Sequence, residues 1–390
     1  MSIKSFHPPA RTLLGPGPSD VHPRVLLAMA RPTIGHLDPD FVTMMDEIKS
    51  LLQHALQTSN AVTLPISGPG SAGMEACFVN LVEPGDTVVV CINGVFGERM
   101  RENVERCGGI PVVVEQEWGR AVDPDRLEDA LKKTPQARLV AFVHAETSTG
   151  AQSDAKTLAE VALRHDCLTL ADAVTSLGGT PVRVDEWKID AIYAGSQKCL
   201  SCAPGLSPVS FSDRAVERIR RRSKVRSWFM DLNLLTAYWG GEGRRVYHHT
   251  APVNALYGLH EALLMLKEEG LEQAWQRHRR NHELLSAGLE AMGLRLAVPE
   301  GERLPQLNAI SVPPGIDEAA VRRQLLDNYG LEIGAGLGRL AGRIWRIGLM
   351  GHSSNPRNVR LCLSALEDVL GAMDVPVTPG TALQALHARS

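Results

Sequence analysis

Two charged side chains stand at the ends of neighbouring apolar runs near the middle of the sequence. Asp172 closes the run "CLTLAD", and Lys198 closes the next one, "IDAIYAGSQK". Burying a carboxylate at the end of a strand costs free energy unless a hydrogen-bond donor or a cation lies beside it. An aspartate in this position is most often a helix N-cap. Lys198 has small or uncharged neighbours, so it is either a loop lysine or an amine held in a dry pocket. In such a pocket its pKa would fall, and the amine could attack a carbonyl and later carry a proton.

A buried lysine paired with a carboxylate predicts a site for pyridoxal phosphate. The lysine forms a Schiff base with the aldehyde of this cofactor. The carboxylate keeps the pyridine nitrogen protonated, so that the ring can accept electrons from a substrate. If the two apolar runs are adjacent parallel strands, Asp172 and Lys198 reach the same rim of the sheet.

A glycine-rich turn in "ISGPGSAGMEA", which begins at residue 66, leads directly into a helical stretch. Backbone N–H groups at the start of a helix suit a phosphate, although such turns are equally often tight connections. The turn lacks the Lys-Ser/Thr of a nucleotide P-loop and the glycine spacing of a dinucleotide fingerprint. Asp172 and Lys198 therefore favour a cofactor phosphate here over a nucleotide.

Three further features could contribute to a site or could be structural. Phe96, in "NGVFGERM", can stack on a flat ring or simply pack. Arg346 lies in the apolar stretch "RIWRIGLMG", where its guanidinium needs an anion such as a substrate carboxylate or a structural ion-pair partner. The stretch "VYHHT" offers Tyr247 and Thr250 as donors beside two histidines, and we see no third ligand for a metal.

Short apolar runs rich in Val, Leu and Ala recur through the first half of the chain. The runs at 86–92, 110–115, 138–145 and 167–173 have the composition of parallel strands buried on both faces. Amphipathic helical stretches, such as "PDRLEDALKKT" and "AKTLAEVALRHD", lie between them. This alternation predicts an α/β domain with a mostly parallel sheet, whose ligands bind beyond the carboxyl ends of the strands.

The pattern changes near residue 255. A long helical stretch covers 254–293, and short strands and helices follow it up to a final helix, "NVRLCLSALEDVLGAM". We expect an N-terminal arm at 1–20, a large α/β domain at 21–265 and a smaller α+β domain at 266–390. Two domains also suit a chain of 390 residues.

Composition narrows the function classes. Hydrophobic residues make up 44% of the chain, and the formal net charge of −3 gives no electrostatic reason to bind nucleic acid or an anionic membrane. No apolar run approaches the roughly 20 residues that span a bilayer. The N-terminus lacks the apolar segment of a signal peptide, so we expect a cytoplasmic protein.

The chain has seven cysteines, which is an odd number. Two of them, Cys199 and Cys202, form a C-x-x-C motif directly after Lys198. That spacing invites a redox or zinc site. No second pair stands at metal-ligand spacing, and the other cysteines lie in apolar contexts. We expect buried thiols in a reducing compartment and no metal.

Taken together, the motifs resemble those of class V aminotransferases. The resemblance rests on "LLGPGPSDVHPRV", "IGHLDP", "SGPGSAGMEA", "VEPGD", "HAETSTG", "ADAVTSLGG", "AGSQKCLSCAPG", "YHHTAPVNALYGLHEAL" and "WRIGLMG". These segments match in order and at family spacing from about residue 12 to residue 370. Within the class they resemble the alanine–glyoxylate and serine–pyruvate aminotransferases. The resemblance implies a fold-type I homodimer, with a seven-stranded-type sheet and active sites shared between two subunits.

The resemblance assigns most of the cofactor contacts. Lys198 would be the Schiff-base lysine, and Asp172 would be the partner of the pyridine nitrogen. Val174 and Phe96 would pack on opposite faces of the ring, where close relatives carry tryptophan in place of Phe96. The phosphate would be held by Pro69, Gly70, Ser71 and Gln197, and by Tyr247 and Thr250 of the other subunit. Relatives often have histidine in place of Ser71, which leaves that contact open.

The resemblance also implies how a substrate binds. Arg346 would hold the substrate carboxylate, with Gly15 and Pro16 lining the same pocket. Thr147 matches a family serine near the ring hydroxyl of the cofactor and the substrate. The expected substrates are small amino acids and 2-oxo acids, including glyoxylate and pyruvate.

Two branches of the family, and two functions outside aminotransfer, compete for this sequence. "QEWGR", "DEWKIDA", "QKCLS", "RIWRIG" and "GTALQALHA" also resemble ureidoglycine–glyoxylate aminotransferases of purine breakdown. Those enzymes tend to carry glutamine in place of His36 and asparagine in place of Tyr247, so the alanine–glyoxylate branch is favoured and His36 joins the candidate substrate-binding residues. A lyase or desulfurase on the same fold would need an exposed, nucleophilic cysteine. A non-catalytic binding protein would be expected to lack the set Lys198, Asp172 and Arg346.

Overall fold

A computed structural model of the chain describes residues 3–222, 224–240, 245–373, 375 and 377–388. Its centre is a seven-stranded sheet in the order β2-β10-β9-β8-β5-β3-β4, which confirms the predicted fold class. The five strands from β9 to β4 run parallel, and β10 is antiparallel to both of its neighbours. The strands are β2 (Val62–Ser67), β3 (Thr87–Ile92), β4 (Ile110–Glu115), β5 (Ala137–Val143), β8 (Leu168–Asp172), β9 (Ala191–Tyr193) and β10 (Leu206–Phe211).

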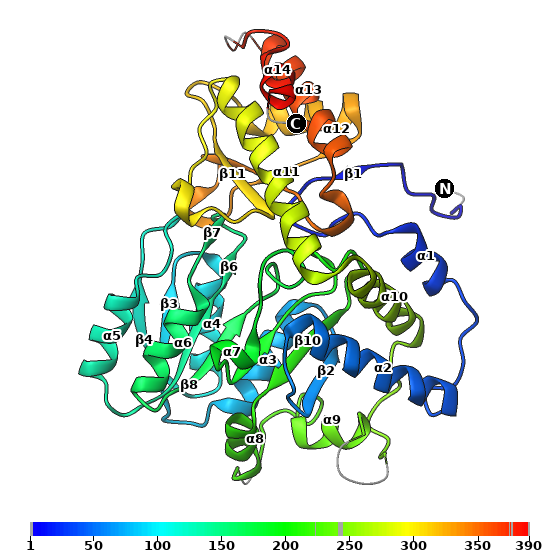
Figure 1. The fold of residues 1–390 in the computed structure, drawn as a ribbon. Helices are drawn as coiled ribbons and strands as arrows, with labels where there is room; N and C mark the ends of the chain where they lie inside the picture. The colour runs from blue at the N-terminus through cyan, green and yellow to red at the C-terminus, as the bar shows by residue number, and fades with distance from the viewer. Residues whose placement is uncertain (1–2, 223, 241–244, 374, 376, 389–390) are drawn as a thin grey trace.

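The central strands are buried on both faces because helices pack against the sheet. All residues of β3 and β8 are buried, as expected for continuous apolar runs in a parallel sheet. Figure 1 shows the helices around the sheet. They are α1 (Pro23–Met29), α2 (Pro39–Leu56), α3 (Gly70–Leu81), α4 (Val95–Arg106), α5 (Pro124–Lys133), α6 (Ala155–Arg164), α7 (Val184–Trp187), α8 (Asp213–Arg220), α9 (Leu232–Tyr238) and α10 (Val253–Glu269).

The C-terminal part of the chain forms a second hydrophobic core, drawn in yellow to red at one end of the molecule in Figure 1. A three-stranded antiparallel sheet in the order β11-β14-β13 lies beside it. Its elements are α11 (Leu271–Ala291), β11 (Leu307–Ser311), α12 (Glu318–Tyr329), β12 (Leu331–Glu332), β13 (Gly334–Ala335), β14 (Ile344–Gly348), α13 (Pro356–Ala372) and α14 (Thr381–His387).

The N-terminal arm joins this second core. Its short strand β1 (Thr12–Leu13) pairs in parallel with β12, and Leu14 is fully buried in the second core. The arm then passes the lysine loop, where the Ser19 hydroxyl donates to the Lys198 carbonyl at 2.7 Å. One segment therefore contacts both the second core and the lysine loop, and the domain limits at 20 and 265 stay a prediction.

The helical stretch predicted at 254–293 is confirmed, and it consists of α10 and α11, which meet at Gly270, whose φ of 88° is a left-handed conformation that interrupts a helix. The expectation about the final helix was wrong. The helix at 356–372 is not the final one, since α14 follows it after a turn.

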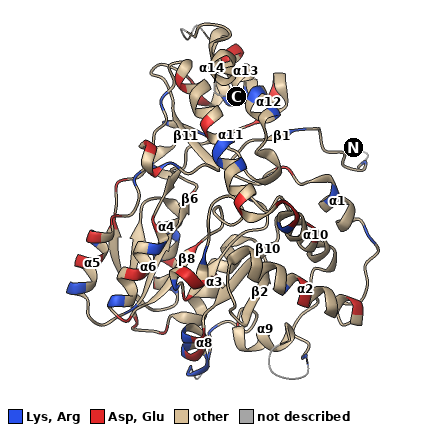
Figure 2. Cartoon of the chain, viewed as in Figure 1, with Lys and Arg blue, Asp and Glu red and all other residues tan. Residues whose placement is uncertain are grey.

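Charged residues are spread over the outer helices, and Figure 2 shows blue and red segments interspersed along α2, α5 and α8. Among the described residues, no helix combines the length and apolar composition that crossing a membrane requires. The same residues contain no group of three or more His, Cys, Asp or Glu side chains that could hold a metal ion.

Candidate active site

A cavity of about 200 Å³ lies at the carboxyl ends of the strands, and nine of the predicted site residues line it. The strands β3, β5, β8 and β9 end on this side of the sheet, and each is followed by a segment that contributes to the wall. The nine residues are Pro69, Gly70, Ser71, Phe96, Thr147, Asp172, Val174, Gln197 and Lys198. The expectation that adjacent parallel strands bring Asp172 and Lys198 to one rim is thus confirmed.

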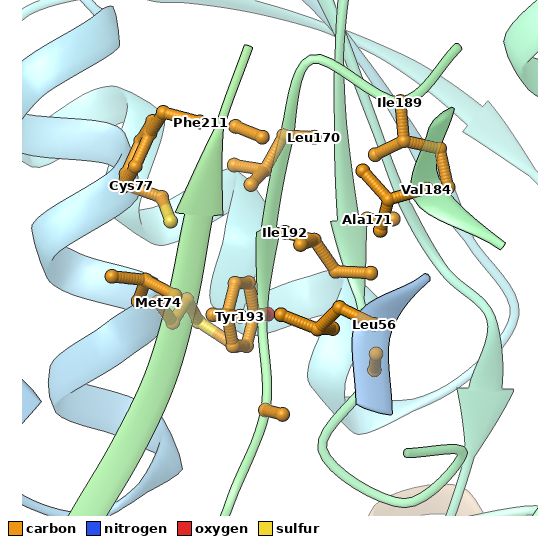
Figure 3. Packing of buried hydrophobic residues seen from close by; sticks show 14 of the residues in the cluster. Leu56, Met74, Cys77, Leu170, Ala171, Val184, Ile189, Ile192, Tyr193 and Phe211 are labelled. Atoms are coloured by element: carbon orange, nitrogen blue, oxygen red, sulfur yellow. The ribbon is translucent and has the colours of Figure 1, made fainter. Parts of the chain in front are cut away.

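Asp172 is held at the last position of β8 by two donors. Its Oδ1 accepts from the Val174 backbone N–H at 2.8 Å, and its Oδ2 accepts from the Tyr193 hydroxyl at 2.7 Å. Tyr193 is itself fully buried among apolar side chains such as Met74, and Figure 3 shows this packing. Burial raises the pKa of Asp172 to about 7, although the two donors act in the opposite direction. A cation placed beside this carboxylate would therefore stabilise its charged form strongly.

Lys198 lies in the loop after β9 and is almost completely buried. Its Nζ donates to the carbonyl of Pro16 in the N-terminal arm. Burial lowers its pKa to about 8, and the nearby positive charge of Arg346 acts in the same direction. The amine is thus much easier to deprotonate than an ordinary lysine, as a nucleophilic lysine requires.

The start of α3 forms one end of the cavity, where the phosphate is predicted to bind. The helix begins at Gly70 after Pro69, and no side chain caps its first turn. A Cβ on Gly70 would come within 2.9 Å of the Val174 side chain, so only glycine lets the helix start approach this wall. Gln197 also lines the cavity, and its buried Oε1 has no hydrogen-bond partner among the described residues. The free N–H groups of the helix start suit a bound phosphate, whereas Gln197 could donate to one only through its amide NH₂ group.

Arg346 is a buried cation beside the cavity. Its Nε donates to the Ala335 carbonyl at 2.6 Å, and its Nη1 donates to the Thr147 carbonyl at 3.0 Å. Within the described part of the chain, no carboxylate forms a salt bridge with it, although Glu146 is close enough to affect its pKa. Burial lowers that pKa to about 10. No salt bridge within the described residues therefore explains this arginine, and its predicted role as the group that binds the substrate carboxylate stays a prediction.

The remaining predicted residues do not line the cavity of this one chain. Pro16 touches it only through the Lys198 amine, and Gly15 packs against β14, where a Cβ on Gly348 would clash with its carbonyl. His36 and Tyr247 lie close to each other, with ring centroids 5.4 Å apart, and Thr250 is exposed. The predicted roles of His36, Tyr247 and Thr250 stay predictions.

The two cysteines after Lys198 are not reactive thiols in this structure. Both Cys199 and Cys202 are buried, and burial raises the pKa of each to about 12. The Cys199 thiol donates to the Thr175 carbonyl at 3.4 Å. A nucleophilic cysteine must be exposed and easily ionised, so this pair does not support a desulfurase.

Sequence reasoning missed several residues of the site. Tyr193 looks like a core tyrosine in an apolar run, and only its hydrogen bond to Asp172 shows its role. Met74, Arg99 and Ala145 line the cavity without any sequence signal that we recognised. Glu146 stands in the quoted motif "HAETSTG", and an acidic residue within a buried turn was a signal that could have been used.

Comparison with known proteins identifies the family. The family model "Aminotransferase class-V" matches residues 24–345. The chain belongs to the class V aminotransferases. An alanine–glyoxylate aminotransferase from Drosophila melanogaster is 40% identical, and the match covers 94% of each chain.

Two solved aminotransferase structures resemble the chain closely. An alanine–glyoxylate aminotransferase from Nostoc sp. has a TM-score of 0.93 at 46% identity, and the match covers 95% of this chain and 98% of that one. A ureidoglycine–glyoxylate aminotransferase from Bacillus subtilis has a TM-score of 0.96 at 40% identity, and the match covers 99% of both chains.

This class V aminotransferase uses pyridoxal phosphate, and the residues present fit that cofactor. The α3 start offers N–H groups to the phosphate, and Asp172 offers a carboxylate to the pyridine nitrogen. Lys198 is the amine that can attach the aldehyde. The chain is therefore a pyridoxal phosphate-dependent transaminase.

Proposed function

We propose that the protein moves an amino group from alanine, or from serine, to glyoxylate. The products would be glycine and pyruvate, or hydroxypyruvate from serine. The observation that carries the proposal is Arg346, a buried guanidinium without a salt bridge to any described residue, next to the Lys198 amine. An arginine fork binds a carboxylate, which amino acids and 2-oxo acids share.

The size of the cavity favours small substrates. A volume of about 200 Å³ is below the roughly 300–1,000 Å³ of pockets for drug-sized ligands, and the cofactor must also fit into it. Little space is left for a long side chain on the donor. Glyoxylate and alanine are among the smallest molecules that carry the carboxylate Arg346 would bind.

Each residue has a distinct task in this mechanism. When bound, the cofactor supplies an aldehyde that takes up the amino group and a ring that accepts electrons. Arg346 would orient the substrate by its carboxylate, and Lys198 would take the proton from the substrate α-carbon and deliver it to the former aldehyde carbon of the cofactor. Asp172 would hold a proton on the ring nitrogen of the bound cofactor, and Phe96 and Val174 would pack on opposite faces of its ring. The buried position of Lys198 keeps water away from the reacting atoms.

The choice of donor rests on His36 and Tyr247. These two residues follow the pattern of the alanine–glyoxylate branch, and they lie side by side, with ring centroids 5.4 Å apart. The His36 ring nitrogen also lies 2.9 Å from the Tyr238 hydroxyl. Because this cluster is outside the cavity of its own chain, it would act on the active site of a second subunit.

We propose a homodimer with shared active sites. Trp228 and Tyr247 are 65% and 60% exposed in the single chain, and they lie together, since Trp228 stacks on His248, the residue after Tyr247. Leu27 of α1 is also 70% exposed. The buried Nε2 of His248, next to Tyr247, has no partner among the described residues. A second copy would cover these groups and bring Tyr247 and Thr250 to its cofactor phosphate.

We also propose a cytoplasmic location. All seven cysteines are free thiols, and six of them are buried. Free thiols are usual in a reducing compartment, although they do not by themselves identify one.

Reaction of the cofactor-loaded enzyme with single donors tests the proposal. Alanine, serine, aspartate and ureidoglycine are added separately, and the visible absorbance of the bound cofactor is followed. We expect alanine or serine to remove the visible band and glyoxylate to restore it.

A response to ureidoglycine alone would place the protein in the ureidoglycine branch and overturn the proposed donor. The relative from Bacillus subtilis is the reason to include that donor. Loss of the band with alanine but no recovery with glyoxylate would overturn the proposed acceptor.

A further inference from the structure

The first turn of α4 is capped by residues from a distant turn of the chain. The Phe96 backbone N–H donates to Glu146 Oε2 at 3.2 Å, and the Val95 N–H donates to the Ser148 hydroxyl at 2.9 Å. The N-cap residue of this helix, Gly94, has no side chain that could do this. The free N–H groups at the start of α4 are thus satisfied from a segment about 50 residues away.

Glu146 is built rigidly into this cap. Its Oε1 accepts from the Ser148 N–H at 3.0 Å and from the Ser148 hydroxyl at 2.6 Å. The side chain has no exposed surface, and a Cβ on Gly94 would lie within 2.5 Å of it. Both carboxylate oxygens therefore face donors in a space that allows no displacement. The partial positive charge of the helix start favours a carboxylate here.

The cap lies between two groups that face the active site. Phe96, in the first turn of α4, lines the cofactor cavity. Thr147, between Glu146 and Ser148, also lines the cavity, and its carbonyl accepts from Arg346. The turn 146–148 therefore contacts both the first turn of α4, which carries Phe96, and the guanidinium of Arg346.

We propose that Glu146 is a positioning residue that fixes Phe96 against the cofactor ring by holding the first turn of α4. The proposal rests on the proposed stacking of Phe96 on the ring. It requires no particular amino donor. Ser148 takes part as the bridge between the carboxylate and the Val95 N–H.

The direct test is the variant Glu146→Gln in the full-length protein. An amide has one acceptor oxygen, so its NH₂ group would face either the Phe96 N–H or the Ser148 donors. We expect the first turn of α4 to shift and the affinity for pyridoxal phosphate to fall roughly two- to tenfold, the range that loss of one aromatic stack represents. Affinity is measured by titrating the cofactor-free protein with pyridoxal phosphate and following visible absorbance.

A double-mutant cycle with Phe96→Leu distinguishes positioning from general loss of stability. If Glu146 acts through Phe96, the double variant binds the cofactor no more weakly than Phe96→Leu alone, and the visible circular dichroism of the bound cofactor decreases in all three variants. Additive losses, or unchanged affinity in Glu146→Gln, would overturn the proposal.

Two more variants keep the test decisive. Asp123→Ala removes a side-chain cap on α5, where Asp123 accepts from the Asp125 N–H at 2.9 Å, and it should leave cofactor affinity unchanged. A loss of affinity there equal to that in Glu146→Gln would contradict a specific role. Should Glu146→Gln fail to fold, Ser148→Ala removes part of the same cap without removing a charge, and the same cycle with Phe96→Leu applies. None of these measurements involves a donor, so failure of this proposal is distinct from failure of the proposed function.

Discussion

Among the residues of the site, Lys198 and Asp172 are the two whose ionisation is changed most usefully by burial, which favours the neutral form of each side chain. The pKa of Lys198 falls to about 8 and that of Asp172 rises to about 7, and burial is the largest cause of both shifts. The lysine amine is then available as a nucleophile near neutral pH, since a lowered pKa favours the neutral form above pH 8. The aspartate is poised to become a full anion as soon as a protonated ring nitrogen lies beside it.

The pH dependence of cofactor attachment should show the lowered pKa of Lys198. When pyridoxal phosphate is added to the cofactor-free protein, the rate at which visible absorbance appears should rise up to about pH 8 and then level off. An amine with the ordinary lysine value of 10.5 would give a rate that keeps rising beyond pH 9.5, and that result would contradict the account. Stopped-flow absorbance between pH 6.5 and 10 provides the measurement.

At the scale of elements, the parallel strands could be predicted and the antiparallel end of the sheet could not. The runs that became β3, β4, β5, β8 and β9 are continuous and apolar, and no proline interrupts the four central ones. β2 and β10 contain Pro65 and Pro208, which lie opposite each other and remove backbone donors from the ladder. Proline within an apolar run argues against a central strand, so the sequence pattern predicted neither β2 nor β10.

Site residues that follow the ends of strands could be predicted from the sequence. Residues whose role depends on packing against distant parts of the chain were missed. Asp172 and Lys198 close apolar runs, which places them at one rim of any parallel sheet. Tyr193 and Glu146 are identified only by their partners, Asp172 and the first turn of α4. Such contacts join residues far apart in the sequence, and no local periodicity encodes them.

The start of α3 should tolerate no side chain. In Gly70→Ala the new Cβ would lie 2.9 Å from the Val174 side chain, which is β-branched and has little rotamer freedom. We expect the affinity for pyridoxal phosphate to fall about tenfold, because the start of α3 and the Val174 side chain must move apart. Titration with pyridoxal phosphate measures the loss.

Gly371→Ala is the matched control, because nothing lies within 4 Å of its Cβ position in α13. It should leave cofactor affinity unchanged and stabilise the helix by up to about 1 kcal/mol. Wild-type affinity in Gly70→Ala would show that the helix start is not part of the phosphate site.

At the scale of the whole molecule, one chain carries groups that its own active site does not use. His36 and Tyr247 pack together away from the cavity, and Thr250 is exposed. Two copies that exchange Tyr247 and Thr250 would place these groups at each other's cofactor phosphate. The dimer is therefore a prediction about function as well as assembly.

Mixing two inactive variants tests the shared site. One chain carries Lys198→Ala, and the other carries Tyr247→Ala with Thr250→Ala. In a mixed dimer, the second chain keeps its lysine and receives intact Tyr247 and Thr250 from the first. Random mixing should restore about a quarter of wild-type activity, since half of the dimers then carry one complete site. Mixed dimers that form but stay inactive would exclude the sharing.

The most direct test of the central claim follows the nitrogen atom. The purified enzyme with bound pyridoxal phosphate is incubated with ¹⁵N-labelled alanine and unlabelled glyoxylate, and the products are analysed by mass spectrometry. Lys198→Ala serves as the control. We expect ¹⁵N in glycine, pyruvate in equal amount, and neither product with the variant. Label released as ammonia, or label that stays in alanine with no glycine formed by the wild-type enzyme, would contradict this reaction.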